Sequence, residues 1–244
     1  MFDALTHLYR CPDPALALKV SEEAGVTDVL IAGVEPGGWV QQSDLAGPGV
    51  HTAYGLHPWT AAEPDGLKAL ARALDTLAPP VAVGEIGLDG SRAHRHRLKQ
   101  QEAVFLAQLD LARQRDLPVI LHIVRAHGAA LACFDQCPAP GGMVHGFSGH
   151  PEVAREWLRR GMSLSYGRLL CDPSARRARA SAAITPLNRL LIETDSPDQL
   201  QNPADLPLVL AALSAIRALP LGLLAAATAE NACRLFRLPV QQLP

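Results

Sequence analysis

The chain has 244 residues, of which 48% are hydrophobic and 19% are charged, so it can bury a large apolar core and is not a disordered protein. Its 22 lysines and arginines stand against 24 aspartates and glutamates, a net charge of -2. This balance excludes a protein that coats nucleic acid through bulk positive charge, but not an enzyme that holds a few phosphates through metal ions.

The sequence predicts no membrane-spanning segment and no secretory signal. The longest apolar stretch, residues 206–227, is interrupted by two prolines and one arginine, and the N-terminus has neither a basic region nor an apolar core. The five cysteines are scattered and odd in number, which is typical of reduced thiols. We therefore expect a cytoplasmic protein without membrane association.

Eight short apolar runs predict strands that are buried on both faces, as in a parallel sheet. They are Met1–Leu5, Thr27–Gly33, Val50–Leu56, Val81–Ile86, Pro118–His122, Gly142–His145, Met162–Tyr166 and Arg189–Ile192. Helical patterns lie between or after them, at Asp13–Ala24, Pro64–Leu77, Leu98–Arg115, Gly128–Gln136, Pro151–Arg160, Pro173–Ile184, Pro203–Leu219 and Leu221–Phe236.

This alternation predicts an α/β protein with a (β/α)₈ TIM barrel, whose usual size of roughly 250 residues fits the chain. The weakest part of the pattern is Glu35–Pro48, which is rich in glycine and proline and is not clearly helical. No linker, repeat or low-complexity block is present, so we expect one domain over residues 1–244.

Six histidines and carboxylates follow or end the predicted strands. Because the carboxyl ends of parallel barrel strands lie on one rim, these side chains are expected to converge. They are His7, His57, Glu85, His122, His145 and Asp195.

Imidazole and carboxylate together suit zinc, manganese or a related divalent ion, and magnesium where carboxylates and water dominate. A single histidine after a strand is more often a hydrogen-bonded core residue than a ligand. Six such residues at the same end of successive strands favour a metal site, because buried carboxylates need a cationic partner.

The sequence resembles the TatD family of metal-dependent deoxyribonucleases, which belong to the amidohydrolase-like barrels. The resemblance covers nearly the whole chain, and four blocks carry it in the family's order: Gly84–Asp89, Leu117–His122, His145–Gly149 and Glu193–Pro197. It implies a TIM barrel of the metallo-dependent hydrolase type.

The resemblance also implies a role for each matching residue. Glu85 corresponds to a carboxylate that bridges two metals, and His122 and His145 correspond to ligands of the second metal. Asp195 corresponds to a ligand of the first metal that also acts as a base or orients the attacking water. His57 corresponds to a contact with a substrate phosphate rather than to a ligand.

One position departs from the family. The family opens with Asp-x-His-x-His, whereas this chain has Asp3-Ala4-Leu5-Thr6-His7, so leucine stands where the first histidine belongs. Leucine cannot bind a metal. The first site keeps His7, Glu85 and Asp195 but lacks one donor, and we expect it to be weak, empty or completed by water, whereas the site of Glu85, His122 and His145 persists. One or two divalent ions (Zn, Mg or Mn) are expected.

Substrate contacts are expected from Arg125, which directly follows the fifth strand, and from Phe147, which stacks on a base or packs the rim. Arginine clusters at residues 92–97 and 176–179 contact a DNA backbone or form solvated helix faces.

The leading hypothesis is a metal-dependent hydrolase that cleaves phosphodiester bonds in DNA from an end, by metal-activated water, with Asp195 and Glu85 as catalytic residues. It is expected to act as a monomer on single-stranded DNA or DNA ends. Two alternatives stay open. One is a hydrolase of a small-molecule amide, ester or lactone on the same barrel. The other is a partly degenerate nucleic-acid-binding protein without catalysis, because Leu5 replaces a ligand.

Overall fold

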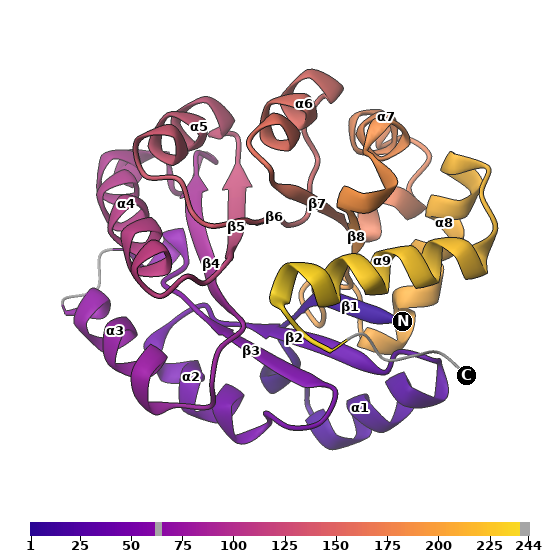
Figure 1. Cartoon of the computed structure of the whole chain (residues 1–244), viewed down its shortest axis with the longest axis horizontal. Coiled ribbons are helices and arrows are strands. Elements are labelled where there is room, and N and C mark those ends of the chain that lie inside the picture. The colour runs from indigo at the N-terminus through magenta and orange to yellow at the C-terminus, as the bar shows by residue number, and fades with distance from the viewer. Residues whose placement is uncertain (62–64, 240–244) are drawn as a thin grey trace. The chain divides into compact units, whose positions relative to one another are not determined.

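The computed structural model describes residues 1–61 and 65–239 (Figure 1). The chain divides into two compact units. The central unit runs from Ile31 to His145. The terminal unit combines Met1–Leu30 with the chain from Gly146 onward. The strand β2 (Asp28–Ala32) passes from one unit into the other.

Parallel strands flanked by helices build the central unit. Its strands after β2 are β3 (Val50–Tyr54), β4 (Ala82–Asp89), β5 (Val119–Val124) and β6 (Gly142–Val144), and each pairs in parallel with the next. Its helices are α2 (Pro36–Asp44), α3 (Gly66–Thr76), α4 (Leu98–Gln114) and α5 (His127–Gln136). All eight residues of β4 are buried, as expected for a strand covered on both faces.

The terminal unit contains the first strand and the last two. Its elements are β1 (Phe2–Thr6), α1 (Pro14–Glu23), α6 (Pro151–Arg159), β7 (Ser163–Tyr166), α7 (Arg176–Ile184), β8 (Leu190–Ile192), α8 (Leu206–Arg217) and α9 (Leu221–Phe236). The strands β7 and β8 pair in parallel. Asp195, just after β8, donates its backbone N–H to the carbonyl of Leu5 (2.9 Å), which ties β1 to the chain beyond β8.

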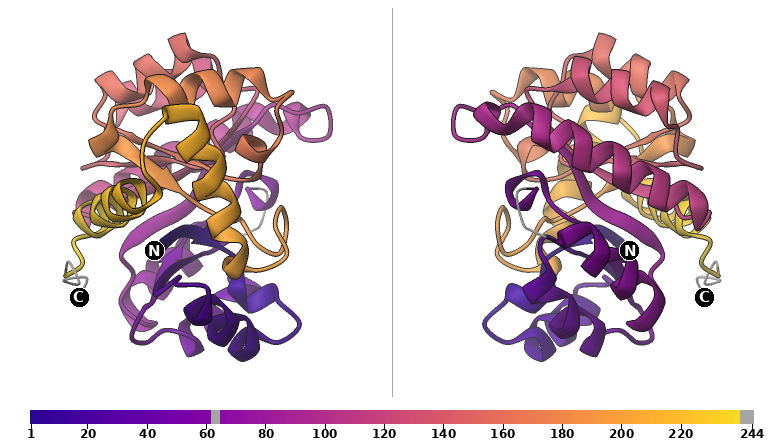
Figure 2. Two further views of the ribbon diagram at one scale, coloured as in Figure 1. Left: turned by 90° about the vertical axis from the view of Figure 1, so that its right-hand side faces the viewer. Right: turned by 90° about the vertical axis from the view of Figure 1, so that its left-hand side faces the viewer.

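Among the described residues, no single helix has the length and apolar character needed to cross a bilayer. One pair of helices passes that test together, Pro203–Arg217 with Leu221–Phe236, but the two are bent by 111° at the break between them. Figure 2 (left) shows α8 and α9 running in different directions.

The predicted strands all form, with ends that shift by at most three residues. The largest shift is in β4, which continues to Asp89 because residues 86–89 pair with residues 121–124 of β5. Glu85 therefore lies inside the strand rather than at its end. The predicted start of α3 at Pro64 lies outside the described residues.

The stretch Glu35–Pro48, which has no clear helical pattern in the sequence, contains the helix α2 over Pro36–Asp44. Pro36 occupies the first turn, where its missing N–H costs nothing. Trp39 is buried, and the side-chain amide of Gln42 donates to the carbonyls of Ile31 (2.6 Å) and Ala53 (2.7 Å). These tertiary contacts outweigh the low helix propensity of two glycines.

Two helices begin later than predicted, because side chains hydrogen-bond to the backbone ahead of them. Asp172 accepts hydrogen bonds from the backbone N–H (2.8 Å) and hydroxyl of Ser174, a turn that holds the chain out of the helix until Arg176. Asn202 and Asp205 form a reciprocal capping box around a 3₁₀ turn, and α8 follows from Leu206.

The pairing of β4 with β5 contains one irregularity, and it lies at the functional residues. Val83 pairs with Val119 but Ile86 pairs with Leu121, so β4 holds one more residue than β5 between these pairs. An extra residue of this kind re-aims the side chain that it carries. The residues between the two pairs are Gly84 and Glu85.

At Gly87, which pairs with His122 in the register, the backbones of β4 and β5 lie very close together, and a substitution tests this packing. The φ of Gly87 is +142°, and a Cβ there would overlap the carbonyl oxygen of His122. Gly87→Ala is expected to lower the free energy of unfolding by about 2–4 kcal/mol, measured by chemical denaturation. Gly37→Ala in α2, where a Cβ meets nothing within 4 Å, should change it by less than about 1 kcal/mol. Equal effects of the two substitutions would contradict the packing described here.

Candidate metal and catalytic site

Glu85 is a buried carboxylate of the central unit. Its side chain is 2% exposed, and its backbone N–H donates to the carbonyl of Gly33 (2.7 Å) in the segment after β2. Gly84 permits the approach of β5 at this point, since a Cβ there would lie 2.5 Å from the Cβ of Ile120. The backbone thus fixes a carboxylate inside the sheet, where an ion needs a partner.

Two histidines surround one oxygen of this carboxylate. Oε2 of Glu85 lies 2.7 Å from Nε2 of His145 and 3.5 Å from Nδ1 of His122, and the two nitrogens lie 3.0 Å apart. His122 stands on β5. His145 directly follows β6 and is held there by its backbone N–H, which donates to the carbonyl of Leu121 (3.1 Å).

Hydrogen bonds among these three side chains cannot all form at the same time. The single hydrogen that Nε2 of His145 can carry serves either Glu85 or His122 well, but not both. A four-coordinate ion with bonds of about 2.0–2.1 Å has donors roughly 3.3 Å apart, close to the three separations found here. The donor set therefore fits a divalent cation.

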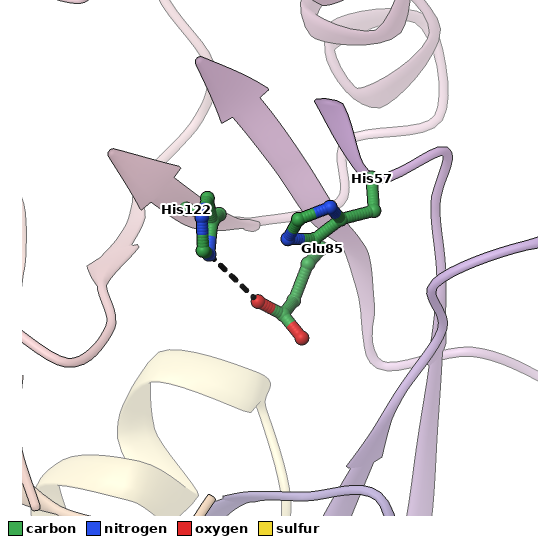
Figure 3. Close-up of side chains that lie close together, drawn as sticks. All are labelled: His57, Glu85 and His122. Atoms are coloured by element: carbon green, nitrogen blue, oxygen red, sulfur yellow. Dashed lines mark ion pairs between the residues drawn. The ribbon is translucent and has the colours of Figure 1, made fainter. Parts of the chain in front are cut away.

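His57 lies at the same cluster, from the segment that follows β3. One ligand atom each of His57, Glu85 and His122 lies within 4.8 Å of the others. Figure 3 shows the three side chains close together. However, Nδ1 of His57 accepts a hydrogen bond from the backbone N–H of Trp59 (3.2 Å). A neutral imidazole that accepts at Nδ1 carries its hydrogen at Nε2, so this ring presents a donor, which suits a phosphate oxygen better than a metal.

In the terminal unit, the structure brings His7 and Asp195 together. Nε2 of His7 lies 3.3 Å from Oδ1 of Asp195, and the side-chain amide of Gln199 donates to Oδ2 (2.8 Å). The backbone N–H of His7 also donates to the carbonyl of Ser196 (2.7 Å). Asp195 has a φ of +50°, an uncommon conformation for a non-glycine residue. Sequence analysis missed Gln199, which no motif marks.

The segment that departs from the family is tightly packed. Leu5 is fully buried. Asp3 accepts hydrogen bonds from the backbone N–H (2.9 Å) and the hydroxyl of Thr194, next to Asp195. Burial raises the pKa of Asp3 to about 8, although the hydrogen bonds from Thr194 act in the opposite direction. Asp3 therefore serves to hold the backbone beside Asp195, and no donor atom stands at position 5.

The two remaining predicted substrate contacts differ in exposure. Arg125 follows β5, is exposed and has a φ of +51°. Phe147 is only 2% exposed and packs edge-on against Tyr166, with ring centroids 6.0 Å apart. Of the two readings that the sequence left open for Phe147, this geometry favours packing.

Trp59 is an aromatic residue at this site that sequence analysis missed. Its ring centroid lies 4.4 Å from that of His57 and 6.1 Å from that of His122. The position two residues after His57 is the only sequence signal that could have drawn attention to it.

Comparison with known proteins finds relatives that match nearly the whole chain. The family profile described as TatD related DNase matches residues 2–237. The uncharacterized metal-dependent hydrolase YjjV of Escherichia coli is 32% identical, and the alignment covers 93% of each chain. The 3'-5' ssDNA/RNA exonuclease TatD of Cronobacter turicensis is 36% identical over 87% of this chain and 88% of its own.

Solved structures give the same result. The crystal structure of E. coli YjjV, a TatD homologue, superposes with a TM-score of 0.91 at 31% identity, covering 98% of both chains. A TatD family hydrolase from Entamoeba histolytica shares the fold at 17% identity, with a TM-score of 0.83. With the eight alternating strands, these likenesses confirm the predicted (β/α)₈ barrel of the metallo-dependent hydrolase type. The chain thus belongs to the TatD-related DNase family and is a metal-dependent hydrolase.

Proposed function

We propose that this hydrolase cleaves phosphodiester bonds of single-stranded nucleic acid from an end. The observation that carries the proposal is the buried carboxylate of Glu85 among three imidazole rings, which fits a divalent ion beside a hydrogen-bond donor for phosphate. The name of the C. turicensis relative, a 3'-5' ssDNA/RNA exonuclease, supports the substrate class. DNA is the expected substrate, and a monomeric state and a cytoplasmic location stay predictions.

In this proposal, Glu85, His122 and His145 hold the ion. A bound divalent ion supplies Lewis acidity toward the phosphoryl oxygen and activates water at neutral pH. His57 donates from Nε2 to a phosphate oxygen, in the tautomer that its bond from Trp59 imposes. Arg125 contributes an exposed cation for a second phosphate.

Asp195 has the role of proton acceptor and orienter. Its two carboxylate oxygens are held separately, one near His7 and one by Gln199, so the carboxylate has one defined orientation. An oriented base of this kind accelerates proton transfer by roughly 10²–10⁴-fold.

The first metal position of the family is the weak one in this chain. His7 and Asp195 remain, but Leu5 presents only methyl groups from a fully buried position. We propose that the ion held by Glu85, His122 and His145 is the tightly bound one. Zinc, manganese and magnesium are the candidates, because the donor set mixes imidazole nitrogen with carboxylate oxygen.

Removal of the Glu85 charge tests the ion site directly. Glu85→Gln is expected to weaken divalent-ion affinity roughly 100-fold or more, since a negative donor at the centre of the site is lost. Competition with a chromophoric chelator measures this affinity. The control is Asp44→Asn, an exposed carboxylate at the end of α2, which should leave it unchanged. An unaltered affinity in Glu85→Gln would remove this carboxylate from the ion site.

The proposed base is tested by Asp195→Asn. On a single-stranded DNA oligonucleotide with Mg²⁺ or Mn²⁺, kcat should fall by about 10²–10⁴-fold because the amide accepts no proton. Asp198→Asn, three residues further on and exposed, should retain activity. Retained cleavage by Asp195→Asn rules out the proposed mechanism. Tight DNA binding by the native chain without any turnover would instead favour the non-catalytic alternative.

The missing ligand makes a prediction about metal content. Elemental analysis after removal of loosely held ions should find one divalent ion per native chain, and two in Leu5→His, which restores the family's donor. Two tightly held ions in the native protein would contradict the proposal that Leu5 weakens the first site.

A further inference from the structure

Trp59 differs from the other two tryptophans of the chain in its exposure. Trp39 and Trp157 are buried in the core, whereas Trp59 is 47% exposed. Its contacts with His57 and His122 place it at the candidate metal site of the central unit. A large, partly exposed aromatic surface is therefore available beside the proposed reaction centre.

Hydrogen bonds hold the indole ring of Trp59 in place. Its Nε1 donates to Oδ2 of Asp89 (2.7 Å), at the end of β4, and Oδ1 of the same carboxylate accepts from the backbone N–H of Ser91 (2.7 Å). Burial alone would raise the pKa of Asp89, but the hydrogen bonds from Trp59 and Ser91 outweigh it, so the pKa lies below its ordinary value. One ionised, buried carboxylate thus fixes both the indole and the start of the segment after β4.

That segment supplies a second ring. His94 stacks on Trp59 with ring centroids 5.2 Å apart and an interplanar angle of 20°. The carbonyl of His94 accepts from the side-chain amide of Gln101 (3.1 Å), and the amide oxygen of Gln101 accepts from the backbone N–H of Asp89 (2.7 Å). Gln101 is buried on α4, and its hydrogen bonds fix the backbone of His94 relative to Asp89. The two rings form a pre-organised platform.

Cations stand next to the platform in sequence. Arg92, Arg95 and Arg97 flank His94 and are exposed. Aromatic faces that stack bases, combined with cations that meet the backbone, are how proteins bind single strands without reading their sequence. Neither feature alone identifies a nucleic acid, but the arginines lie within three residues of His94, and the platform contacts the cluster of Glu85, His122 and His57.

We propose that Trp59 and His94 form a nucleobase-stacking platform that positions the nucleotide adjacent to the scissile phosphate. This inference rests on the proposed function, since it names the part of the substrate that this face of the site binds. Stacking tolerates every base, so the platform confers a requirement for a base without a preference among bases.

Tryptophan fluorescence tests the contact without hydrolysis. Titration of the Mg²⁺-loaded protein with a phosphorothioate-linked ten-residue oligothymidylate should quench the emission of Trp59, because a stacked base quenches indole. In Trp59→Phe the remaining tryptophans are buried, so the quench should vanish while anisotropy of a labelled strand still reports binding. An undiminished quench in Trp59→Phe would overturn the proposal.

A strand without bases isolates the stacking contribution. The native protein should bind the oligothymidylate about 5- to 30-fold more tightly than an abasic strand of the same length and backbone. Trp59→Ala should bind the two strands with nearly equal affinity, and His94→Ala should lie between the native protein and Trp59→Ala. Val40→Ala, an exposed apolar residue of α2, is the matched control and should keep the native difference.

Two further outcomes separate this inference from the proposed function. If the native protein hydrolyses the phosphodiester oligothymidylate while Trp59→Ala keeps the native preference for bases, the platform is wrong and the nuclease function stands. If the native protein neither binds nor hydrolyses the strand with Mg²⁺, Mn²⁺ or Zn²⁺, both are wrong.

Discussion

The buried negative charge of Glu85 is the constraint on which the rest of the site depends. A carboxylate enclosed in a sheet loses its hydration, and hydrogen bonds with histidines return only part of that free energy. Because His122 and His145 crowd the same oxygen, the arrangement is most stable with a cation among the three atoms. The chemistry proposed for the chain follows from the way in which this one charge is neutralised.

The fold supplies this constraint through a local irregularity. One extra residue in β4, small residues at Gly84 and Gly87, and the hydrogen bond from Glu85 to Gly33 together let the carboxylate leave the regular alternation of the strand. A regular strand would place the same residue in a different direction. The irregularity is therefore part of the ion site, and its removal affects stability and metal affinity together.

The sequence predicted most of the secondary structure and the members of the site, because both leave local signals. Buried apolar runs identify strands such as β5, and a histidine or carboxylate at the end of such a run is visible without coordinates. The helix α2 was missed since its stability comes from Trp39 and Gln42 in the fold, against the local propensity of its glycines. The stacking of Trp59 on His94 joins residues 35 positions apart in the chain, a contact that no periodicity encodes.

Asp89 links the ring of Trp59 to the loop that begins at Ser91, and the loop can vary in sequence and length more freely than the strands. One oxygen of Asp89 fixes the ring of Trp59 beside His57 and His122, and the other fixes the beginning of an exposed, arginine-rich loop. Exchange of that loop for one of another length or charge would alter substrate choice while the ion ligands on the strands stay in place. Through this shared anchor, relatives with the same reaction centre can diverge in what they degrade without rebuilding their cores.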